Sequence, residues 1–325
     1  MRIFRHLKYS VLLMLAITAI NVRAQVDAQL TQYWAVPNYY NPAATGDIDF
    51  IHITAGSRLQ WVGIKHAPMT FMALGDMPFK FMGRRWGTGV LLQQESMGLY
   101  RNTTAAAQLS WKKKLLGGTL SAGVQAGIIN ETFRGSKVIT LDGDDAHSSA
   151  DDAIPQGDVA GTAFDASAGV MFRHKWFWAG VSATHLTAPT VTLKTDGDEE
   201  HYYEFDAGRV YYFMAGSNIP IKNTLFELQP SVFAKSDFNF WQAEATLRMR
   251  YNKFLSAGVA YRYKDAVSFL IGADYKNFTF GYSYDYATSA ISRVSTGSHE
   301  VFVSYNVKLD MGEKNRNKQK SIRIM

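Results

Sequence analysis

The sequence predicts a transmembrane antiparallel β-barrel of about fourteen strands, and three observations lead to this fold class. Segments of about ten residues alternate between apolar and polar side chains, the length that a tilted strand needs to cross a bilayer. An apolar run near the N-terminus has the form of an export signal, and long and short connections alternate between the segments. The mean hydropathy of -0.14 excludes a bundle of membrane helices.

The N-terminal region has the three parts of a secretory signal peptide. Basic residues precede the apolar run Val11 to Ile20, and a small-residue motif ends at Ala24. About ten apolar residues cannot cross a bilayer core of about 30 Å, so we expect cleavage after Ala24. The chain contains no cysteine, so it is not a disulfide-stapled secreted scaffold.

Four regions are expected along the chain. They are a signal peptide (1–24), an irregular lead-in (25–48), an outer-membrane β-barrel (49–309) and a basic periplasmic tail (310–325). The lead-in contains Pro37 and Pro42 and shows no usable period, so we expect a plug-like or surface-lying segment rather than a strand.

The strands are recognised by their period of two. Phe278 to Tyr286 is the clearest case, with Phe and Tyr on one face and Thr, Gly, Ser and Asp on the other. The predicted strands are 49–58, 68–76, 86–96, 101–112, 118–131, 162–173, 176–187, 203–217, 224–235, 238–251, 254–264, 266–276, 277–286 and 298–309.

The connections support a barrel independently of the strands. If the chain starts in the periplasm, the short and mostly basic connections face inward, and the two longest, Glu131 to Gly161 and Ala188 to Tyr202, face outward. Unequal rims are typical of transmembrane barrels. A soluble exported β-sandwich also has alternating strands, but the even strand number, the unequal rims and the signal peptide favour the barrel.

The polar faces of the strands are expected to line the lumen, because a charge facing lipid at mid-depth costs about 2–4 kcal/mol. Glu244, Arg248 and Arg250 form a charge ladder that is either an ion-selective constriction or a pairing network that rigidifies the barrel. Further charged residues with the same placement are Asp165, Arg173, Arg262, Lys264, Asp274 and Asp285. Aromatic residues near strand ends, expected to form the interfacial girdles, include Trp86, Trp111, Trp176, Tyr251, Tyr261 and Tyr286.

The long outer loops are acidic. Clustered carboxylates can bind calcium, but the first loop lacks the glycine and terminal glutamate spacing of an EF-hand, so a solvated or partner-binding surface is favoured over a metal site. A second acidic run, 196–201, is interpreted in the same way. The residues expected to form the partner surface of the first loop are Asp142, Asp144, Asp145, Asp151 and Asp152.

No enzymatic motif is present. The sequence contains neither a G-x-S-x-G elbow nor a phosphate-binding loop that opens a helix, and its histidines lack the HExxH spacing. His185 and His201 lie near acids at the outer rim, which leaves an outer-membrane hydrolase as a minor alternative. We therefore expect no enzyme, no catalytic residues and no cofactor. The net charge of +6 comes with no basic helix or aromatic platform, so nucleic-acid binding is not expected.

Two stretches resemble a known family. Gln32, Tyr33, Pro37, the run Asn41-Pro42-Ala43 and Gly46 resemble the QY-x3-P-x3-NPA-x2-G opening of the PorP/SprF family. The run from Ser57 to Trp61, with Arg58, Gln60 and Trp61, is similar to the arginine-(x)-glutamine-tryptophan signature of the same family. The chain departs from the family pattern at Leu59, where Asn is frequent, in its longer acidic loop and in its basic tail.

The resemblance implies a component of the type IX secretion system of Bacteroidetes-type bacteria, located in the outer membrane and without bond-making chemistry of its own. The partners it implies are a secreted surface protein such as an adhesin, often used in gliding motility, and periplasmic secretion machinery, besides outer-membrane lipid. The alternative is a channel for small solutes, for instance a fatty-acid-transporter-like barrel. We also hypothesise that Gln32, Tyr33, Asn41 and Pro42 fix the lead-in within the lumen or its mouth.

Overall fold

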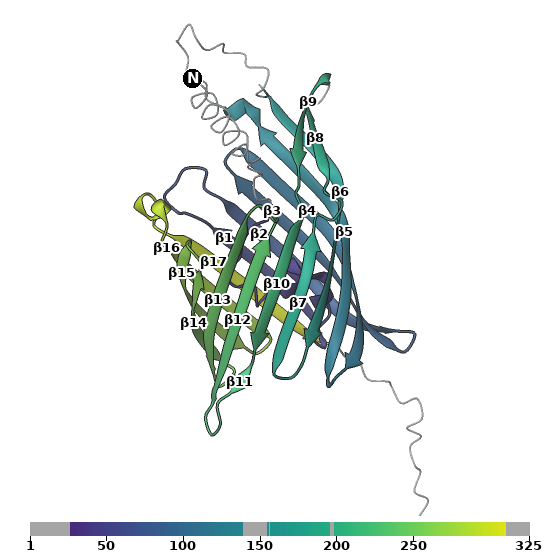
Figure 1. The fold of residues 1–325 in the computed structure, drawn as a ribbon, viewed down its shortest axis with the longest axis vertical. Coiled ribbons are helices and arrows are strands. Elements are labelled where there is room, and N and C mark those ends of the chain that lie inside the picture. The colour runs from purple at the N-terminus through teal and green to yellow at the C-terminus, as the bar shows by residue number, and fades with distance from the viewer. Residues whose placement is uncertain (1–26, 139–154, 156, 196–197, 310–325) are drawn as a thin grey trace, which may run out of the picture.

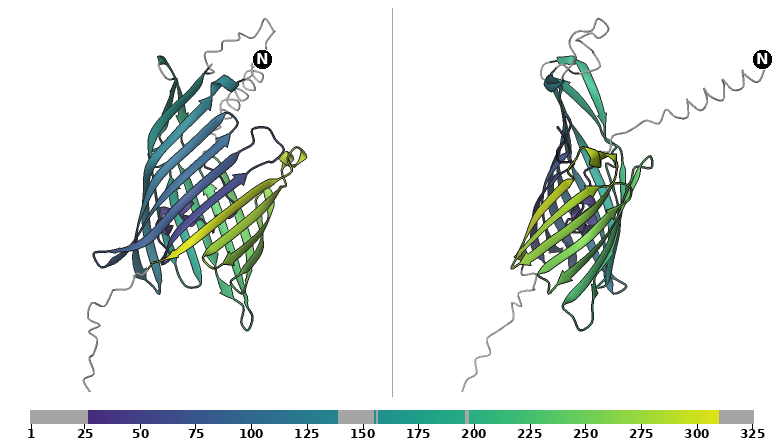
Figure 2. Two further views of the ribbon diagram at one scale, coloured as in Figure 1. Left: turned by 180° about the vertical axis from the view of Figure 1, so that it is seen from behind. Right: turned by 90° about the vertical axis from the view of Figure 1, so that its left-hand side faces the viewer.

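The computed structural model describes residues 27–138, 155, 157–195 and 198–309, which form one closed antiparallel barrel (Figures 1 and 2). Seventeen strands make one sheet, and pairing between the first and the last of them closes it. Two strands, β8 and β9, form a hairpin above the wall, and β11 extends a turn by two residues. Removing these three from the seventeen leaves fourteen wall strands, as the sequence predicts.

The strands have the following bounds: β1 (Phe50–Leu59), β2 (Met69–Phe81), β3 (Arg84–Met97), β4 (Tyr100–Leu115), β5 (Gly118–Arg134), β6 (Asp158–Arg173), β7 (Phe177–Thr184), β8 (Thr190–Thr195), β9 (Asp198–Asp206), β10 (Val210–Ser217), β11 (Ile219–Pro220), β12 (Phe226–Ser236), β13 (Trp241–Tyr251), β14 (Leu255–Arg262), β15 (Ala266–Tyr275), β16 (Phe278–Ala287) and β17 (Ser298–Lys308). The helical elements are single turns: α2 (Pro37–Tyr40), η1 (Pro42–Ala44), η2 (Gly135–Lys137) and η3 (Ala290–Arg293). Within the described ranges, no helix combines the length and the apolar character needed to cross a membrane.

The two rims differ as expected. Phe50 pairs with Lys308, so the barrel begins and ends at the same rim. At that rim, two-residue turns at 82–83 and 116–117 have positive φ at both positions, for example φ 50° at Met82 and 71° at Gly83. Such turns match the twist of adjacent strands. The opposite rim carries the connections 60–68, 135–157, 185–209 and 288–297, so we assign it to the outer side of the membrane.

The two faces of the wall separate as the alternation predicts. In β15, Ile271 is 61% exposed on the outer face, while Ser268, three residues earlier, is fully buried on the lumen face. The outer face carries a belt of exposed apolar side chains that in the membrane contact lipid. Because successive strand residues point to opposite faces, the same alternation directs the polar half of each strand into the lumen.

The structure corrects two strand predictions. Residues 203–217, expected to be one strand, divide into the end of β9 and the separate strand β10, and β7 pairs directly with β10 below the β8–β9 hairpin. Apolar and aromatic residues continue on both sides of Ala207, so the sequence pattern does not show where one strand ends and the next begins. Lys264, expected in the lumen, lies in the exposed turn after β14 with φ 57°, because that strand ends at Arg262.

Strands β5 and β6 are longer than the roughly ten residues that a bilayer requires. They contain 17 and 16 residues, and their upper halves continue above the barrel, where β8 joins β6 (Figure 1). A small separate core forms there from Val159, Val191 and Leu193, with Phe133 and Phe205 packed against it. This projection, together with the β8–β9 hairpin, gives the outer rim a folded surface of its own.

Candidate functional site

Residues 27–46, called the lumen segment below, cross the inside of the barrel from the outer rim to the inner rim. At the outer end, Asp27 accepts a hydrogen bond from Thr184, the last residue of β7, at 3.0 Å. Just beyond the inner end, Asp47 pairs with Lys112 at 2.6 Å and with Arg173 at 2.9 Å. Almost every residue between these anchors is buried, so the lumen is filled rather than open along this path.

The local sequence explains why this segment is not a strand. Pro37 begins the single turn α2, and Asn41 then caps the next turn, η1, by accepting the N–H of Ala43 at 2.9 Å. The Asn41 side-chain amide also donates to the carbonyls of Val170 and Val181, each at 3.2 Å. The side chain of Asn41 thus caps a turn and anchors it by hydrogen bonds to two wall strands.

A buried ion network holds the outer half of the segment. Glu300 accepts the backbone N–H groups of Thr31 and Gln32 at 2.8 and 2.9 Å. Arg58 donates to Asp285 at 2.7 Å, to Glu300 at 3.1 Å and to the Thr31 hydroxyl at 3.0 Å. Carboxylates that accept backbone N–H groups form strong hydrogen bonds, and here they replace the partners that water would otherwise supply.

Arg262 extends this network along the wall. It donates to Glu244 at 2.7 Å and to the Thr31 hydroxyl at 2.8 Å, and it lies 3.3 Å from Asp285. Two guanidinium groups and three carboxylates, all at most 2% exposed by residue, therefore surround one threonine.

Aromatic packing fixes the middle of the segment. The Tyr40 ring lies 4.7 Å from Phe233 and 5.1 Å from Tyr212, and Tyr33 lies 4.9 Å from Phe233. Each such pair contributes about 0.5–1.5 kcal/mol beyond its buried area. The Tyr33 hydroxyl donates to Ser231 at 2.9 Å, so its polar end is also satisfied.

The inner half is held by polar side chains of β2 and β4. Asp76 accepts the Gly46 N–H at 2.7 Å, and Gln108 donates to the Asn38 carbonyl at 2.7 Å. Ser110 donates to the Thr45 carbonyl, also at 2.7 Å. The backbone of the segment thus finds hydrogen-bond partners on the wall in place of water.

Glycines of the wall allow the segment to lie close to it. A methyl group added to Gly123 would overlap the backbone of Pro42, and one added to Gly169 would overlap the Asn41 side chain. At Gly75, on the outer face, an added methyl group would meet only Val90 at an ordinary 3.7 Å.

The substitution Gly123→Val is expected to displace the η1 turn and to destabilise the barrel by about 1–3 kcal/mol through overpacking. The measurement is the urea midpoint of purified protein in detergent. Gly75→Val is the matched control and should leave the midpoint nearly unchanged. Equal shifts for the two variants would argue against close packing between segment and wall.

The residues expected to matter occupy defined places. Gln32, Tyr33, Asn41 and Pro42 are buried in the lumen segment, and Pro37 lies at the start of α2. Arg58 belongs to the ion network. Gln60 and Trp61 lie in the outer loop after β1, where the Trp61 N–H donates to Ser298 at 3.1 Å.

The predicted charge ladder lies on β13 and faces the lumen, but its members do not pair with one another. Glu244 pairs with Arg262, and Arg250 pairs with Asp274 at 2.8 Å. Among the described residues, Arg248 has no acidic partner; its guanidinium lies over the Trp34 ring instead, 3.1 Å from the centroid.

Several predictions fall outside the described residues. These are the signal peptide, the basic tail and the acidic loop with Asp142, Asp144, Asp145, Asp151 and Asp152. Within the described ranges, no group of three or more His, Asp or Glu side chains is arranged to hold a metal ion.

His185 does not have the arrangement of a catalytic base. Its ring lies between Asp165 and Asp27, with each ring nitrogen 3.0 Å from a carboxylate oxygen. Burial alone would lower the pKa of His185, but the charge of Asp27 and the hydrogen bonds to both carboxylates outweigh burial and raise it to about 10. A histidine that remains protonated at neutral pH serves to bind the segment rather than to accept a proton. The side chain of His201 lies outside the described part.

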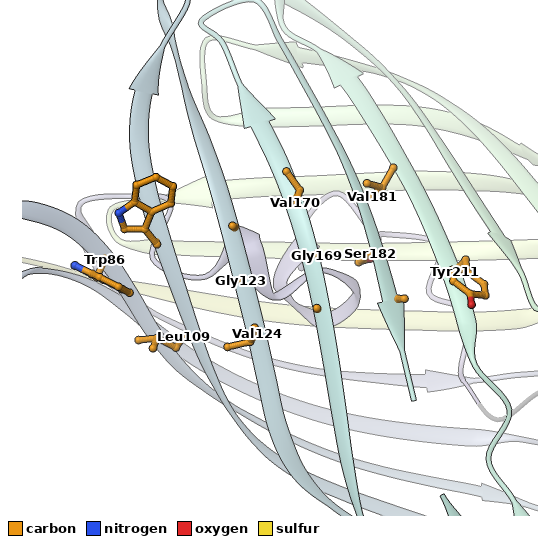
Figure 3. Close-up of a pocket in the computed structure, with 13 residues that line it drawn as sticks. Trp86, Leu109, Gly123, Val124, Gly169, Val170, Val181, Ser182 and Tyr211 are labelled. Carbon is orange, nitrogen blue, oxygen red and sulfur yellow. The ribbon is translucent and has the colours of Figure 1, made fainter. Parts of the chain in front are cut away.

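The large depressions on the surface belong to the lipid-facing belt. Figure 3 shows one of them, where Trp86, Leu109, Val124 and Val181 lie on neighbouring wall strands. Val124 and Val181 are 57% and 55% exposed, as expected of side chains that contact lipid. A cavity of about 190 Å³ lies between the lumen segment and the inner half of the wall.

The geometry defines a class of protein: an outer-membrane β-barrel with a lumen occupied by its own N-terminal segment. The chain belongs to the PorP/SprF family of type IX secretion system membrane proteins, whose family model matches residues 22–305. That match begins before the lumen segment and ends within β17, so it includes both the segment and nearly the whole wall. A search of curated proteins found no match.

Several solved structures of outer-membrane proteins are similar to the chain. A TodX monoaromatic hydrocarbon channel mutant is 12% identical, with 83% of this chain and 93% of that chain covered and a TM-score of 0.47. The Ralstonia pickettii toluene transporter TbuX is 10% identical, with coverages of 83% and 92% and a TM-score of 0.47. The Acinetobacter baumannii protein Omp33 is 8% identical, with coverages of 79% and 99% and a TM-score of 0.45.

Proposed function

We propose that this barrel serves the type IX secretion system as a closed partner barrel that assists secretion or surface anchoring of an exported protein such as an adhesin. The observation that supports this role is the lumen segment, which is buried and hydrogen-bonded to the wall along its length. A lumen filled in this way favours a function in which the two rims bind partners over passage of solutes through the barrel.

The rims offer different chemistry to different partners. The outer rim carries the β8–β9 hairpin and the small core beneath it. Exposed basic residues at the inner rim suit acidic periplasmic proteins of the secretion machinery, since complementary charge speeds and directs association. These residues are Arg84, Lys113, Lys114, Lys175, Lys222, Lys253 and Lys276.

The test is an affinity pull-down of the tagged barrel from detergent-solubilised outer membranes of its own host, followed by quantitative mass spectrometry. We expect a large secreted protein and periplasmic secretion components. The double variant Lys113→Glu with Lys114→Glu should lose the periplasmic components and keep the secreted protein, because only the inner rim changes.

Lys264→Glu is the matched control, since Lys264 is an exposed cation at the opposite rim. It should keep the periplasmic components. A barrel recovered without protein partners, together with uptake of sugars or fatty acids in liposomes, would contradict the proposal and favour the solute-channel alternative.

A further inference from the structure

The inner half of the lumen contains a cavity lined by Arg248, an arginine that has no acidic partner among the described residues. The cavity lies between Trp34 and Pro37 of the lumen segment and the wall strands β6, β7, β10, β12 and β13, and its volume is about 190 Å³. Its wall residues include Arg173 and Trp178 near the inner-rim ends of β6 and β7, and Asn218 in the turn after β10. A ligand would therefore approach from the periplasmic side.

Arg248 is the central cation of this cavity. Its guanidinium has no hydrogen bond and no ion pair among the described residues, and its Nε is buried without a partner. Its guanidinium carbon lies over the face of the Trp34 ring, 3.1 Å from the centroid. The Trp34 indole N–H, in the same cavity, is also buried without an acceptor. Buried donors are usually satisfied, so an arginine that lines a lumen cavity without an acidic partner points to an acceptor that binds there.

The neighbouring carboxylates interact with residues other than Arg248. Asp274 pairs with Arg250, Asp47 pairs with Arg173 and Lys112, and Glu227 accepts the side-chain amide of Gln229 at 3.1 Å. The lining of the cavity contains two guanidinium groups, those of Arg173 and Arg248, and no carboxylate, which favours an anionic ligand.

We propose that this cavity binds a carboxylate presented from the periplasmic side, as an acidic side chain or the C-terminus of a peptide. A guanidinium matches the two oxygens of a carboxylate in a forked pair of hydrogen bonds. The other walls include Trp34, Pro37, Trp178 and Pro230, whose apolar surfaces suit the carbon skeleton of such a group better than a hydrated inorganic ion. The inference stands on this geometry and does not require the proposed function.

The site also bears on the lumen segment. An incoming carboxylate would draw Arg248 into a stronger interaction than its contact with the Trp34 ring, because a charge-assisted forked pair of hydrogen bonds is stronger than a cation–π contact. Trp34 is one of the few half-buried residues of the segment. Occupation of the cavity therefore acts on the segment where it is least enclosed by the wall.

The test measures binding of trifluoroacetate, the carboxylate probe, to the full-length barrel in detergent. Binding is detected as broadening of the ¹⁹F NMR line of the probe. Broadening should be saturable, reversed by triglycine, which has a free carboxylate, and unaffected by triglycinamide, which lacks one. Arg248→Gln should weaken binding roughly tenfold, because the forked pair of charge-assisted bonds is lost. Arg250→Gln, two residues along the same face, should bind the probe normally, because Asp274 already holds that guanidinium.

Heat-modifiable migration in gels confirms that each variant is folded. If Arg248→Gln does not fold, Arg248→Lys keeps the charge and should bind roughly threefold or more weakly, because an ammonium cannot form the fork. Unchanged binding in Arg248→Gln, equal losses in Arg248→Gln and Arg250→Gln, or displacement by inorganic phosphate as effective as by triglycine would overturn the proposal. None of these outcomes depends on whether the pull-down recovers a secretion partner, so the two proposals fail separately.

Discussion

Removal of residues 27–46 is expected to turn a closed barrel into a conducting pore. Eight-stranded barrels are filled by their own side chains, whereas 16–18 strands leave an aqueous channel, so fourteen strands emptied of their segment should conduct. In planar bilayers, single-channel conductance should rise roughly tenfold or more over the intact protein, for which only brief openings are expected.

The control for this deletion is Arg250→Gln, which changes a lumen charge and leaves the segment in place. A synthetic peptide of residues 27–46, added to the deletion variant, should reduce the conductance again by occupying its former place. Equal conductance with and without the segment would show that it does not close the lumen.

The second large effect is expected at the buried ion network. Arg262→Met leaves Glu244 and Asp285 without one of their cations in a site that is almost fully buried. Loss of one partner from a buried pair costs about 3–5 kcal/mol, whereas Arg250→Met, at a half-exposed pair, should cost about 1 kcal/mol or less. Urea unfolding in detergent, followed by gel migration, measures both.

A double variant separates the charge from the packing. Arg262→Met combined with Glu244→Met removes a buried cation together with one of its carboxylates, so it should recover part of the stability lost in Arg262→Met. A double variant less stable than the single variant by the full cost of Glu244→Met would show that the two residues do not interact energetically.

The fold was predictable because one physical rule governs every wall strand. Lipid on one face and polar lumen on the other impose a period of two, and fourteen such strands are visible in the sequence. The break between β9 and β10 was missed because aromatic residues continue across it, so the pattern alone does not separate a wall strand from the hairpin above it. The predicted strands 118–131 and 162–173 leave out only the last three residues of β5 and the first four of β6. These residues lie above the membrane, where no lipid-facing side imposes an alternation of apolar and polar side chains.

The site was predictable in part. The period placed Arg262 and Asp285 on the lumen face, and the resemblance singled out Gln32, Asn41 and Arg58, but neither predicted which residues meet. Glu300 was not singled out, although it stands on the polar face of β17, because its role depends on Thr31 and Gln32. Pairings inside a barrel depend on register and on the path of the segment, and neither is a local property of the sequence.

The contact between Thr31 and Glu300 has a consequence for the order of assembly. The two residues are 269 positions apart, and Glu300 lies on the strand that also closes the wall against β1. Contacts between residues so distant in the chain form late, because the intervening chain must first be ordered. The N–H groups of Thr31 and Gln32 thus receive their acceptor only when β17 arrives, and the same strand completes the wall and secures what fills it. A chain without β17 would therefore lack both the strand that closes the wall against β1 and the acceptor that holds the outer half of the lumen segment.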